Sequence, residues 1–405
     1  MENLKEREYN QRPGESFEAW KYRLILGKKD GEVELSWTDI CNTLGLNCGQ
    51  EYIRKIAMGI YEYRNYLRQQ HEDEELSDSE LNSIGKAEAA EMRSRMTKMQ
   101  MQDQKRMVNR DLREWARAEH LQETIAKAIQ NLNTEKPLVV KKRHINKDAK
   151  NEGALLLSDW HVGMVTDNAV NKFNKVIFKQ RIEKLMQDTI ENAKRHDIKK
   201  LHVFSLGDLA NGLIHVTTRI NNEEDIVQQC ITVAETLSEM LMEFSESFDV
   251  NFYWSRGNHE RVSANKKESV CRESFSDLIL WFLKARLANL DGITICENKM
   301  DDEIIITDIC GQTCLAVHGH KDKPARSLQN LALLLKIFPD YIFMGHFHSN
   351  AERDIQGAEV IVNGSLCGTD DYAMSLRRTS IPSQKFMVFN SDGRLCTYNI
   401  RLDRK

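Results

Sequence analysis

Residues 154–161 read Ala-Leu-Leu-Leu-Ser-Asp-Trp-His, so that a short apolar run ends directly in an acid and a histidine. A run of this length between polar residues is typical of a buried strand. Four later runs end in the same way, in an acid, an amide or a histidine; they lie at 203–208, 252–260, 315–320 and 342–348. Longer amphipathic segments alternate with the runs, at 175–196, 225–245 and 269–287. The alternation predicts an α/β fold.

The side chains that follow these runs are good metal ligands. Because the carboxyl ends of the strands in an open α/β sheet meet at one crevice, donors distant in sequence can converge there. Seven candidates follow the runs, namely Asp159, His161, Asp208, Asn258, His318, His346 and His348. All offer nitrogen or oxygen and none offers sulfur, which suits manganese, iron or zinc. Seven side chains are too many for one ion, so we expect two divalent ions that share one carboxylate.

Taken in order, these motifs resemble those of the calcineurin-like metallophosphoesterase superfamily. The matching motifs are Asp-x-His at 159–161, Gly-Asp-x-x-x-Gly at 207–212, Gly-Asn-His-Glu at 257–260, a lone histidine at 318 and Gly-His-x-His at 345–348. The resemblance covers roughly residues 152–400. It implies an αββα sandwich, in which two sheets are flanked by helices and a dinuclear metal centre lies at the sheet edge.

The resemblance also implies a role for each residue. Asp159, His161 and His348 would hold the first metal, Asn258, His318 and His346 the second, and Asp208 would bridge them. His259 matches the catalytic histidine, which stabilises the transition state or protonates the leaving oxygen. The implied reaction is hydrolysis of a phosphate ester by a metal-activated water. Manganese is the expected metal, and iron and zinc are alternatives.

Three further residues are candidates for catalysis. Asn211 stands three positions after Asp208, where the double-strand-break repair nucleases of the superfamily carry a second catalytic histidine. His215 could supply that imidazole from the loop at 214–222, and Arg219 in the same loop could neutralise phosphate charge. Both loop residues could equally be ordinary surface residues.

Residues 1–70 read as a small all-α domain that resembles a helix-turn-helix. Ser36 is a capping residue for a short helix that ends at Gly45. The following segment, 50–68, places apolar residues at three- and four-residue spacing and puts Arg54 and Lys55 on its remaining surface. The second helix of such a motif enters the major groove, so we expect DNA as a partner. A docking or dimerisation domain is the alternative.

Residues 71–136 predict one long, charged amphipathic helix, because the segment lacks proline and spaces Met92, Met96 and Met99 by four and three residues. Its apolar stripe needs a partner. That partner is the catalytic domain, another part of the same helical rod, or the same helix of a second chain in a coiled-coil homodimer. Residues 137–151 read as a basic linker, with a phosphate-contacting patch as the alternative, and we expect 152–405 to form the phosphoesterase domain.

Composition excludes a membrane protein. No apolar run approaches the roughly 20 residues that a spanning helix needs, and the amino-terminal residues are charged, so we expect a cytoplasmic protein without a membrane partner. The net charge of -4 over 405 residues leaves nucleic acid open as a partner.

The sequence favours a phage-type DNA nuclease or a related DNA-processing phosphodiesterase. A helix-turn-helix and a basic linker add affinity for a nucleic-acid backbone, and residues 362–383 resemble the tail of phosphoesterases encoded by bacteriophages and prophages. The alternative enzyme acts on nucleotides, cyclic nucleotides or phosphoprotein, and its amino-terminal region serves oligomerisation. A third possibility is a non-enzymatic DNA-binding or scaffold protein. The intact metal ligands and His259 argue against it.

Overall fold

The computed structural model describes residues 9–46, 49–70, 78–132, 138–139, 145, 148–214, 222–263, 265–266, 269–270 and 273–403. The chain divides into two compact units, Met1–Arg113 and Glu114–Lys405, and each is described by itself. His215 and Arg219 lie outside the described residues, as does most of the predicted basic linker.

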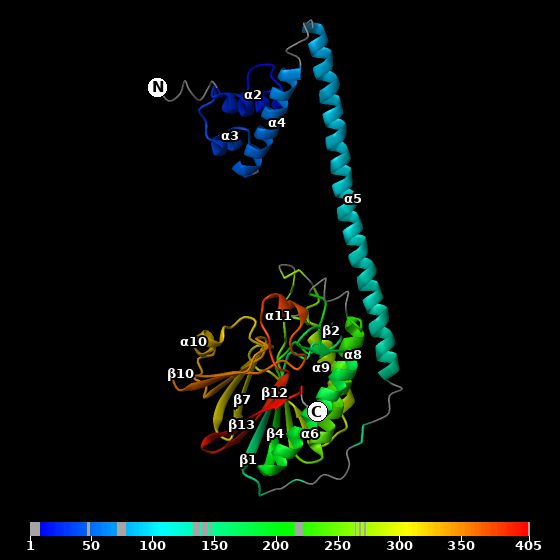
Figure 1. Cartoon of the computed structure of the whole chain (residues 1–405), viewed down its shortest axis with the longest axis vertical. Helices are drawn as coiled ribbons and strands as arrows, with labels where there is room; N and C mark the ends of the chain where they lie inside the picture. The colour runs from blue at the N-terminus through cyan, green and yellow to red at the C-terminus, as the bar shows by residue number, and fades with distance from the viewer. Residues whose placement is uncertain are drawn as a thin grey trace. The chain divides into compact units, whose positions relative to one another are not determined.

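The carboxyl-terminal unit contains two β-sheets and a small hairpin (Figure 1). The first sheet consists of β1 (Asn151–Leu157), β4 (Ile198–Ser205), β5 (Asp249–Trp254), β6 (Ile293–Ile295), β12 (Ser383–Asn390) and β13 (Gly393–Arg401). The second consists of β7 (Ile304–Ile309), β8 (Gln312–Val317), β9 (Tyr341–Met344), β10 (Ala351–Ile355) and β11 (Ala358–Val362). The hairpin pairs β2 (Thr166–Asp167) with β3 (Lys172–Phe173). The strand orders are β13-β12-β1-β4-β5-β6 and β10-β11-β9-β8-β7.

Helices cover the outer face of each sheet. Among the described residues after β1, the helices are α6 (Lys175–Arg195), α8 (Ile226–Ser245), α9 (Phe275–Leu287), α10 (Pro324–Leu335) and the short α11 (Asp371–Ser375). Successive strand residues point to opposite faces, so Leu155 and Leu157 join the core formed with α6, α8 and α9, whereas Leu156 packs between the two sheets. A third core lies between the second sheet and α10. The layers confirm the αββα sandwich that the sequence predicts.

Parallel strands place the loops of interest at one edge. In the first sheet β1, β4 and β5 run parallel, and in the second β8, β9 and β11 run parallel. All the apolar runs that end in candidate ligands fall on these strands. Because the loops after them contact one another across the two sheets, their side chains meet in a single site.

The long helix α5 (Asp78–Leu132) runs from the first unit into the second. Near its end, Leu121, Ile125 and Ala128 pack against the core that includes α8 and α9. Farther back, the side chains of Met96 and Met99 are 57% and 65% exposed. The last turns of the apolar stripe on α5 thus pack within the carboxyl-terminal unit. For the exposed part of the stripe, packing against a second chain in a homodimer stays a prediction.

The amino-terminal unit packs α2 (Phe17–Asp30), α3 (Trp37–Thr43) and α4 (Gln50–Gln70) around a small core that includes Leu24 and Ile40. Ser36 caps α3, because its side chain accepts the N–H of Asp39 while the Asp39 carboxylate accepts the N–H of Ser36. No helix among the described residues is both long and apolar enough to span a membrane.

Candidate metal centre

The five strand-end loops bring all seven predicted ligands to one place. Asp159 and His161 follow β1, Asp208 follows β4, Asn258 follows β5, His318 follows β8, and His346 and His348 follow β9. Asp159, His161, Asp208 and His318 are each no more than 3% exposed. Buried acids and imidazoles at this density need a partner that satisfies them.

Several of these residues have strained backbones. Asp159, His161, Asp208, His346 and His348 have φ between 48° and 68°, a region that residues with a Cβ rarely adopt. Each such residue costs about 1–3 kcal/mol and persists only where its surroundings hold it. Hydrogen bonds do so here. The N–H of His346 donates to Oδ2 of Asp159 at 3.0 Å, and the N–H of His161 donates to the carbonyl of Asp208 at 3.2 Å.

The first cluster of donor atoms is formed by Asp159, His161 and His348. The Nε2 atoms of His161 and His348 lie 3.2 Å apart, and Nε2 of His348 lies 3.3 Å from Oδ1 of Asp159. Two like nitrogens this close share at most one proton between them. A cation bound by both lone pairs resolves the conflict, and this set fits the first metal.

The second cluster is centred on His318. Its Nε2 atom lies 3.0 Å from Oδ2 of Asp208 and 3.1 Å from Oδ1 of Asn258. Asp208 also belongs to two groups of mutually close donor atoms, one with His318 and His346 and the other with His161 and His259. Asp208 therefore occupies the position between two clusters that a bridging carboxylate needs.

The tautomer of His318 suits a metal ligand. Its Nδ1 atom lies 2.7 Å from the carbonyl oxygen of Leu206. Because a carbonyl only accepts, Nδ1 carries a proton, so Nε2 is the ring nitrogen that can offer its lone pair to a metal, as in most metal-binding histidines. Nδ1 of His161 is buried and has no hydrogen-bond partner among the described residues. Burial and the neighbours His259 and His348 lower the pKa of His161 well below its usual value, which keeps the ring neutral, as a ligand must be.

The charges of the second cluster also fit a cation. Burial opposes ionisation of Asp208, yet His318 and His259 outweigh it and hold the pKa of Asp208 well below its usual value. Burial likewise opposes charge on His318, but Asp208 raises the pKa of this imidazole to about 9. Without metal, a proton on His318 balances the carboxylate. A divalent ion would take over that role and release the proton.

Glu260 is a buried anchor to which the sequence analysis gave no role. Its carboxylate accepts the backbone N–H groups of Leu209 at 2.6 Å, Ala210 at 3.2 Å and Asp208 at 3.2 Å. Burial and the Asp208 charge raise the pKa of Glu260 to about 7. The residue ties the loop after β4 to the loop after β5. The feature of the sequence that could have identified Glu260 as a site residue is its place at the end of the motif at 257–260.

Two glycines allow the same loops to approach closely. A Cβ on Gly257 would lie 2.2 Å from the backbone nitrogen of Asp208, and a Cβ on Gly212 would lie 1.9 Å from the carbonyl oxygen of His259. Both distances are far below contact. The absence of a side chain at Gly257 therefore lets the loop after β5 approach Asp208, and its absence at Gly212 lets the loop after β4 approach His259.

His259 faces the clusters from a fixed orientation. Its backbone N–H donates to Oδ1 of Asp208 at 2.8 Å, and its Nδ1 donates to the carbonyl of Asn211 at 2.9 Å. Its Nε2 lies 4.0 Å from Oδ2 of Asp208. The side chain of Asn211 donates to Asn222 at 2.7 Å. Asn211 thus contacts His259 through its backbone.

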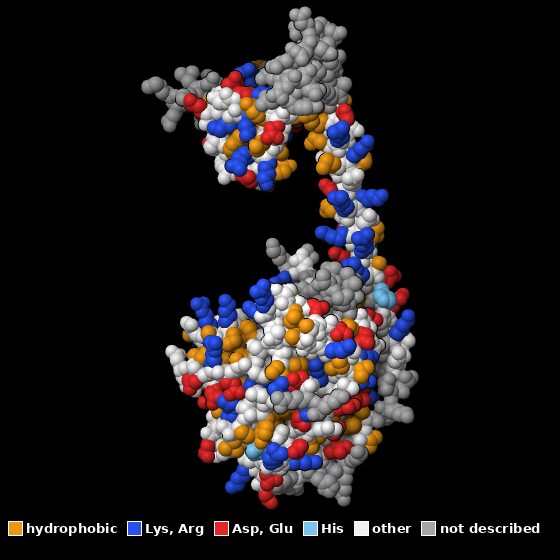
Figure 2. All heavy atoms as spheres, viewed as in Figure 1, with side chains coloured by type: hydrophobic (Ala, Val, Ile, Leu, Met, Phe, Trp, Pro, Cys, Tyr) orange, Lys and Arg blue, Asp and Glu red, His pale blue; other side chains and the backbone are white. Residues whose placement is uncertain are grey.

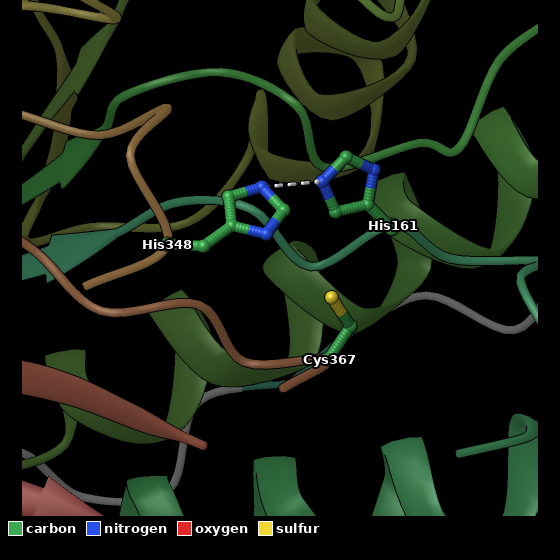
Figure 3. A group of neighbouring side chains, drawn as sticks. All are labelled: His161, His348 and Cys367. Atoms are coloured by element: carbon green, nitrogen blue, oxygen red, sulfur yellow. Dashed lines mark hydrogen bonds between the residues drawn. The ribbon is translucent and has the colours of Figure 1, made fainter. Parts of the chain in front are cut away.

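Cys367 adds a thiol that the sequence analysis did not place at the site. It follows β11, the parallel neighbour of β9, so it reaches the same edge. Its Sγ lies within 4.8 Å of ring nitrogens of both His161 and His348, toward which it points (Figure 3). Burial raises the pKa of the Cys367 thiol. The signal that could have found it is its position after the run at 360–362.

Comparison with known proteins now adds to this geometry. Residues 154–362 match the family model of the calcineurin-like phosphoesterases. The chain is 22% identical over 405 residues to the SPbeta prophage-derived uncharacterized protein YonJ of Bacillus subtilis (strain 168), across 96% of this chain and 97% of that protein.

Two solved structures are similar to part of the chain. An archaeal phosphodiesterase is 15% identical, with a TM-score of 0.31, over 59% of this chain and 94% of its own. Vacuolar protein sorting 29 from Cryptosporidium parvum is 14% identical, with a TM-score of 0.30, over 60% of this chain and 86% of its own. The family model spans more than half of the chain, and the family is dinuclear and metal-dependent. The chain belongs to the calcineurin-like phosphoesterase family and is a metal-dependent phosphoesterase.

Proposed function

We propose that the chain is a DNA nuclease or DNA-processing phosphodiesterase of phage type. Two divalent ions would be held by the two clusters: Asp159, His161 and His348 at the first position, Asn258, His318 and His346 at the second, and Asp208 between them. When bound, the ions would supply an activated water and screen the charge of the phosphate. We expect Mn2+ to support turnover, with iron or zinc as alternatives.

His259 would serve the leaving group. Because its Nδ1 proton is held by the Asn211 carbonyl, the ring cannot flip without losing a hydrogen bond, and Nε2 stays directed to the site. A proton on Nε2 can then pass to the leaving oxygen as the ester bond breaks. Asn211 would position this histidine through its backbone. Roles for His215 and Arg219 remain predictions from the sequence.

The observation that carries the choice of DNA is the basic stretch at 93–113 of α5, a helix whose acids and bases nearly balance over its full length. Between Arg93 and Arg113 the helix has seven lysines and arginines against two aspartates, and these side chains are exposed. Arg95, Arg106 and Arg110 pair with acids on the same helix. Among the described residues, Arg93, Lys98, Lys105 and Arg113 make no ion pair. Figure 2 shows blue side chains along this helix.

A basic surface of this kind suits a polyanion. Twenty residues of helix span about 30 Å, whereas a duplex presents a phosphate charge about every 1.7 Å of its axis. Several phosphates could therefore meet α5 at once. A nucleotide or phosphomonoester is too small to use such a surface, so the surface supports a polymer as substrate.

Two further features support the same choice. On α4, Arg54 and Lys55 are exposed and Tyr52 is 62% exposed, so the helix after the α3 turn presents cationic and aromatic groups to solvent. The prophage-derived relative is similar along nearly the whole chain, which supports a phage setting for both units.

The test is a cleavage assay on four substrates: single-stranded DNA, duplex DNA, a cyclic dinucleotide and a phosphomonoester, each with Mn2+. We expect DNA cleavage by the parent and none by Asp208→Asn. The control variant is His196→Gln, because His196 bonds Tyr398 just before β4 begins, at the opposite end of that strand from Asp208. Rapid cleavage of the cyclic dinucleotide without cleavage of DNA would overturn the proposal in favour of the nucleotide alternative.

A further inference from the structure

We propose that Cys367 is a thiol donor for the first metal position and makes that position prefer zinc or another thiophilic ion over manganese. The inference rests on the proposed two-metal function and concerns which ion that site selects. The seven ligands predicted from the sequence offer only nitrogen and oxygen to the two positions. The structure places a sulfur beside one of them.

Geometry is the first support. The Sγ atom lies within 4.8 Å of ring nitrogens of His161 and His348, whose own Nε2 atoms are 3.2 Å apart. In Figure 3 the thiol points from the loop after β11 toward the two imidazole rings. Cys367 is fully buried and His161 is 3% exposed, whereas the side chain of His348 is 26% exposed, so the group is open to solvent only on the His348 side. One thiol and two imidazoles that lie this close together are donors that suit a borderline ion such as zinc.

The loop that carries the thiol is fixed to a first-position ligand. The backbone N–H groups of Leu366 and Cys367 donate to the carbonyl oxygen of Asp159 at 3.1 and 3.4 Å. The buried Arg181 donates to the carbonyls of both loop residues at 2.8 Å. Asn171 donates to the Cys367 carbonyl at 2.8 Å. These bonds hold the backbone of Cys367 beside Asp159, while its Sγ contacts the Ser365 hydroxyl at 3.1 Å, a contact that a bound metal would replace.

The two metal positions then differ in softness. Cys367 joins the group of His161 and His348, whereas the group of Asp208, His318 and His346 contains no sulfur. A thiolate favours zinc, cobalt and iron, while oxygen and imidazole donors also accommodate manganese. As the sulfur–metal bond forms, the thiol proton leaves to solvent and no redox change occurs. The second position would therefore accept manganese while the first retains zinc.

Cobalt reports the sulfur bond directly. After removal of metal with a chelator, full-length protein titrated with Co2+ should develop a thiolate-to-cobalt charge-transfer band in the near ultraviolet. The band should be lost in Cys367→Ser and kept in Cys230→Ser, which changes a fully buried thiol on α8. The spectrum of the unmodified protein tests the proposal by itself. A parent without the band overturns the proposal even if Cys367→Ser fails to fold.

Affinity is the second readout. Equilibrium dialysis with Zn2+ and with Mn2+ should show that Cys367→Ser and Cys367→Ala lower the zinc-to-manganese affinity ratio by about 10- to 100-fold, the range for removing a partner from a metal site. An unchanged ratio in both folded variants overturns the proposal. Asp208→Asn separates this failure from failure of the two-metal function. If that variant binds both metals as the parent does, the function itself is wrong.

Discussion

The backbone N–H of His259 donates a 2.8 Å hydrogen bond to Oδ1 of Asp208, whose other oxygen lies 3.0 Å from Nε2 of His318. The carboxylate between the two clusters is therefore held on one side by the backbone of the proposed catalytic residue. This bond links the position of the leaving-group histidine to the position of the metals. It uses no atom of the His259 side chain, so side-chain variants test catalysis while sparing the carboxylate.

Replacement of His259 by asparagine should lower phosphodiester hydrolysis by about 10²- to 10⁴-fold, the usual contribution of a general acid. Metal content should stay the same, because the backbone bond to Asp208 survives. Hydrolysis of bis-p-nitrophenyl phosphate and metal analysis of the same preparation give both numbers. Full activity in His259→Asn would contradict the assignment.

Gly212→Ala should be far more damaging than Gly357→Ala. Both glycines have positive φ, at 72° and 87°, so both variants carry a similar backbone strain. The new methyl at 212 would lie 1.9 Å from the His259 carbonyl oxygen, whereas a methyl at 357 meets open space. We expect Gly357→Ala to cost about 1 kcal/mol and keep its activity. Gly212→Ala should lose most activity in the folded protein; equal effects on activity and on Tm would refute the close approach.

Glu152 should make stability depend on acid pH. Burial opposes its charge, but His202 and Lys200 outweigh burial and lower the pKa of Glu152 to about 2 from 4.5. A lowered folded pKa adds stability above pH 4.5, which is lost as pH falls toward 2. Because the carboxylate is partly exposed, Glu152→Gln should cost about 1–2 kcal/mol at pH 7 and less at pH 3.

The exposed pair of Asp167 and Lys172 supplies the control for this measurement. Asp167→Asn should leave the free energy of unfolding almost unchanged, because exposed ion pairs contribute little. Urea unfolding at the two pH values measures both variants. A loss for Glu152→Gln that is as large at pH 3 as at pH 7 would show that its charge is not responsible.

Reversal of the four exposed cations of α5 should weaken DNA binding. Changing Arg93, Lys98, Lys105 and Arg113 to glutamate should lower affinity and flatten its dependence on salt, because fewer counterions are released. Hydrolysis of bis-p-nitrophenyl phosphate should not change. Lys179→Glu with Lys194→Glu, on exposed positions of α6, is the control. Unaltered DNA affinity in the α5 variant would remove the main support for a DNA substrate.

The strand ends could be predicted from sequence because the signal is local. At β1, β4, β5, β8 and β9 an apolar run passes directly into a ligand residue, and parallel pairing then brings the ends together. The hairpin of β12 and β13 was not predicted. Gln384 and Lys385 are fully buried in β12 and interrupt its apolar pattern. Lys385 can be buried there because it bonds Glu352 on β10 and Asn399, its partner on β13.

The parts of the site that were missed depend on contacts between distant segments. Glu260 acts by accepting N–H groups about 50 residues earlier, and Cys367 reaches His161 only because β11 lies beside β9. Neither contact produces a repeating pattern of residues that could be recognised in the sequence. The orientation of Asn211 could not be predicted for the same reason, because it depends on contacts with other segments. Its side chain donates to Asn222, and its carbonyl oxygen accepts a hydrogen bond from His259.

Phosphodiester hydrolysis by parent and Asp208→Asn proteins, each assayed after chelation and after addition of Mn2+ or Zn2+, tests the central claim most directly. Asp208 lies between both clusters, so its loss should remove metal binding and turnover together. We predict activity only in the metal-loaded parent. Equal hydrolysis by the chelated parent, or by Asp208→Asn with metal, would contradict a two-metal phosphoesterase centred on this carboxylate.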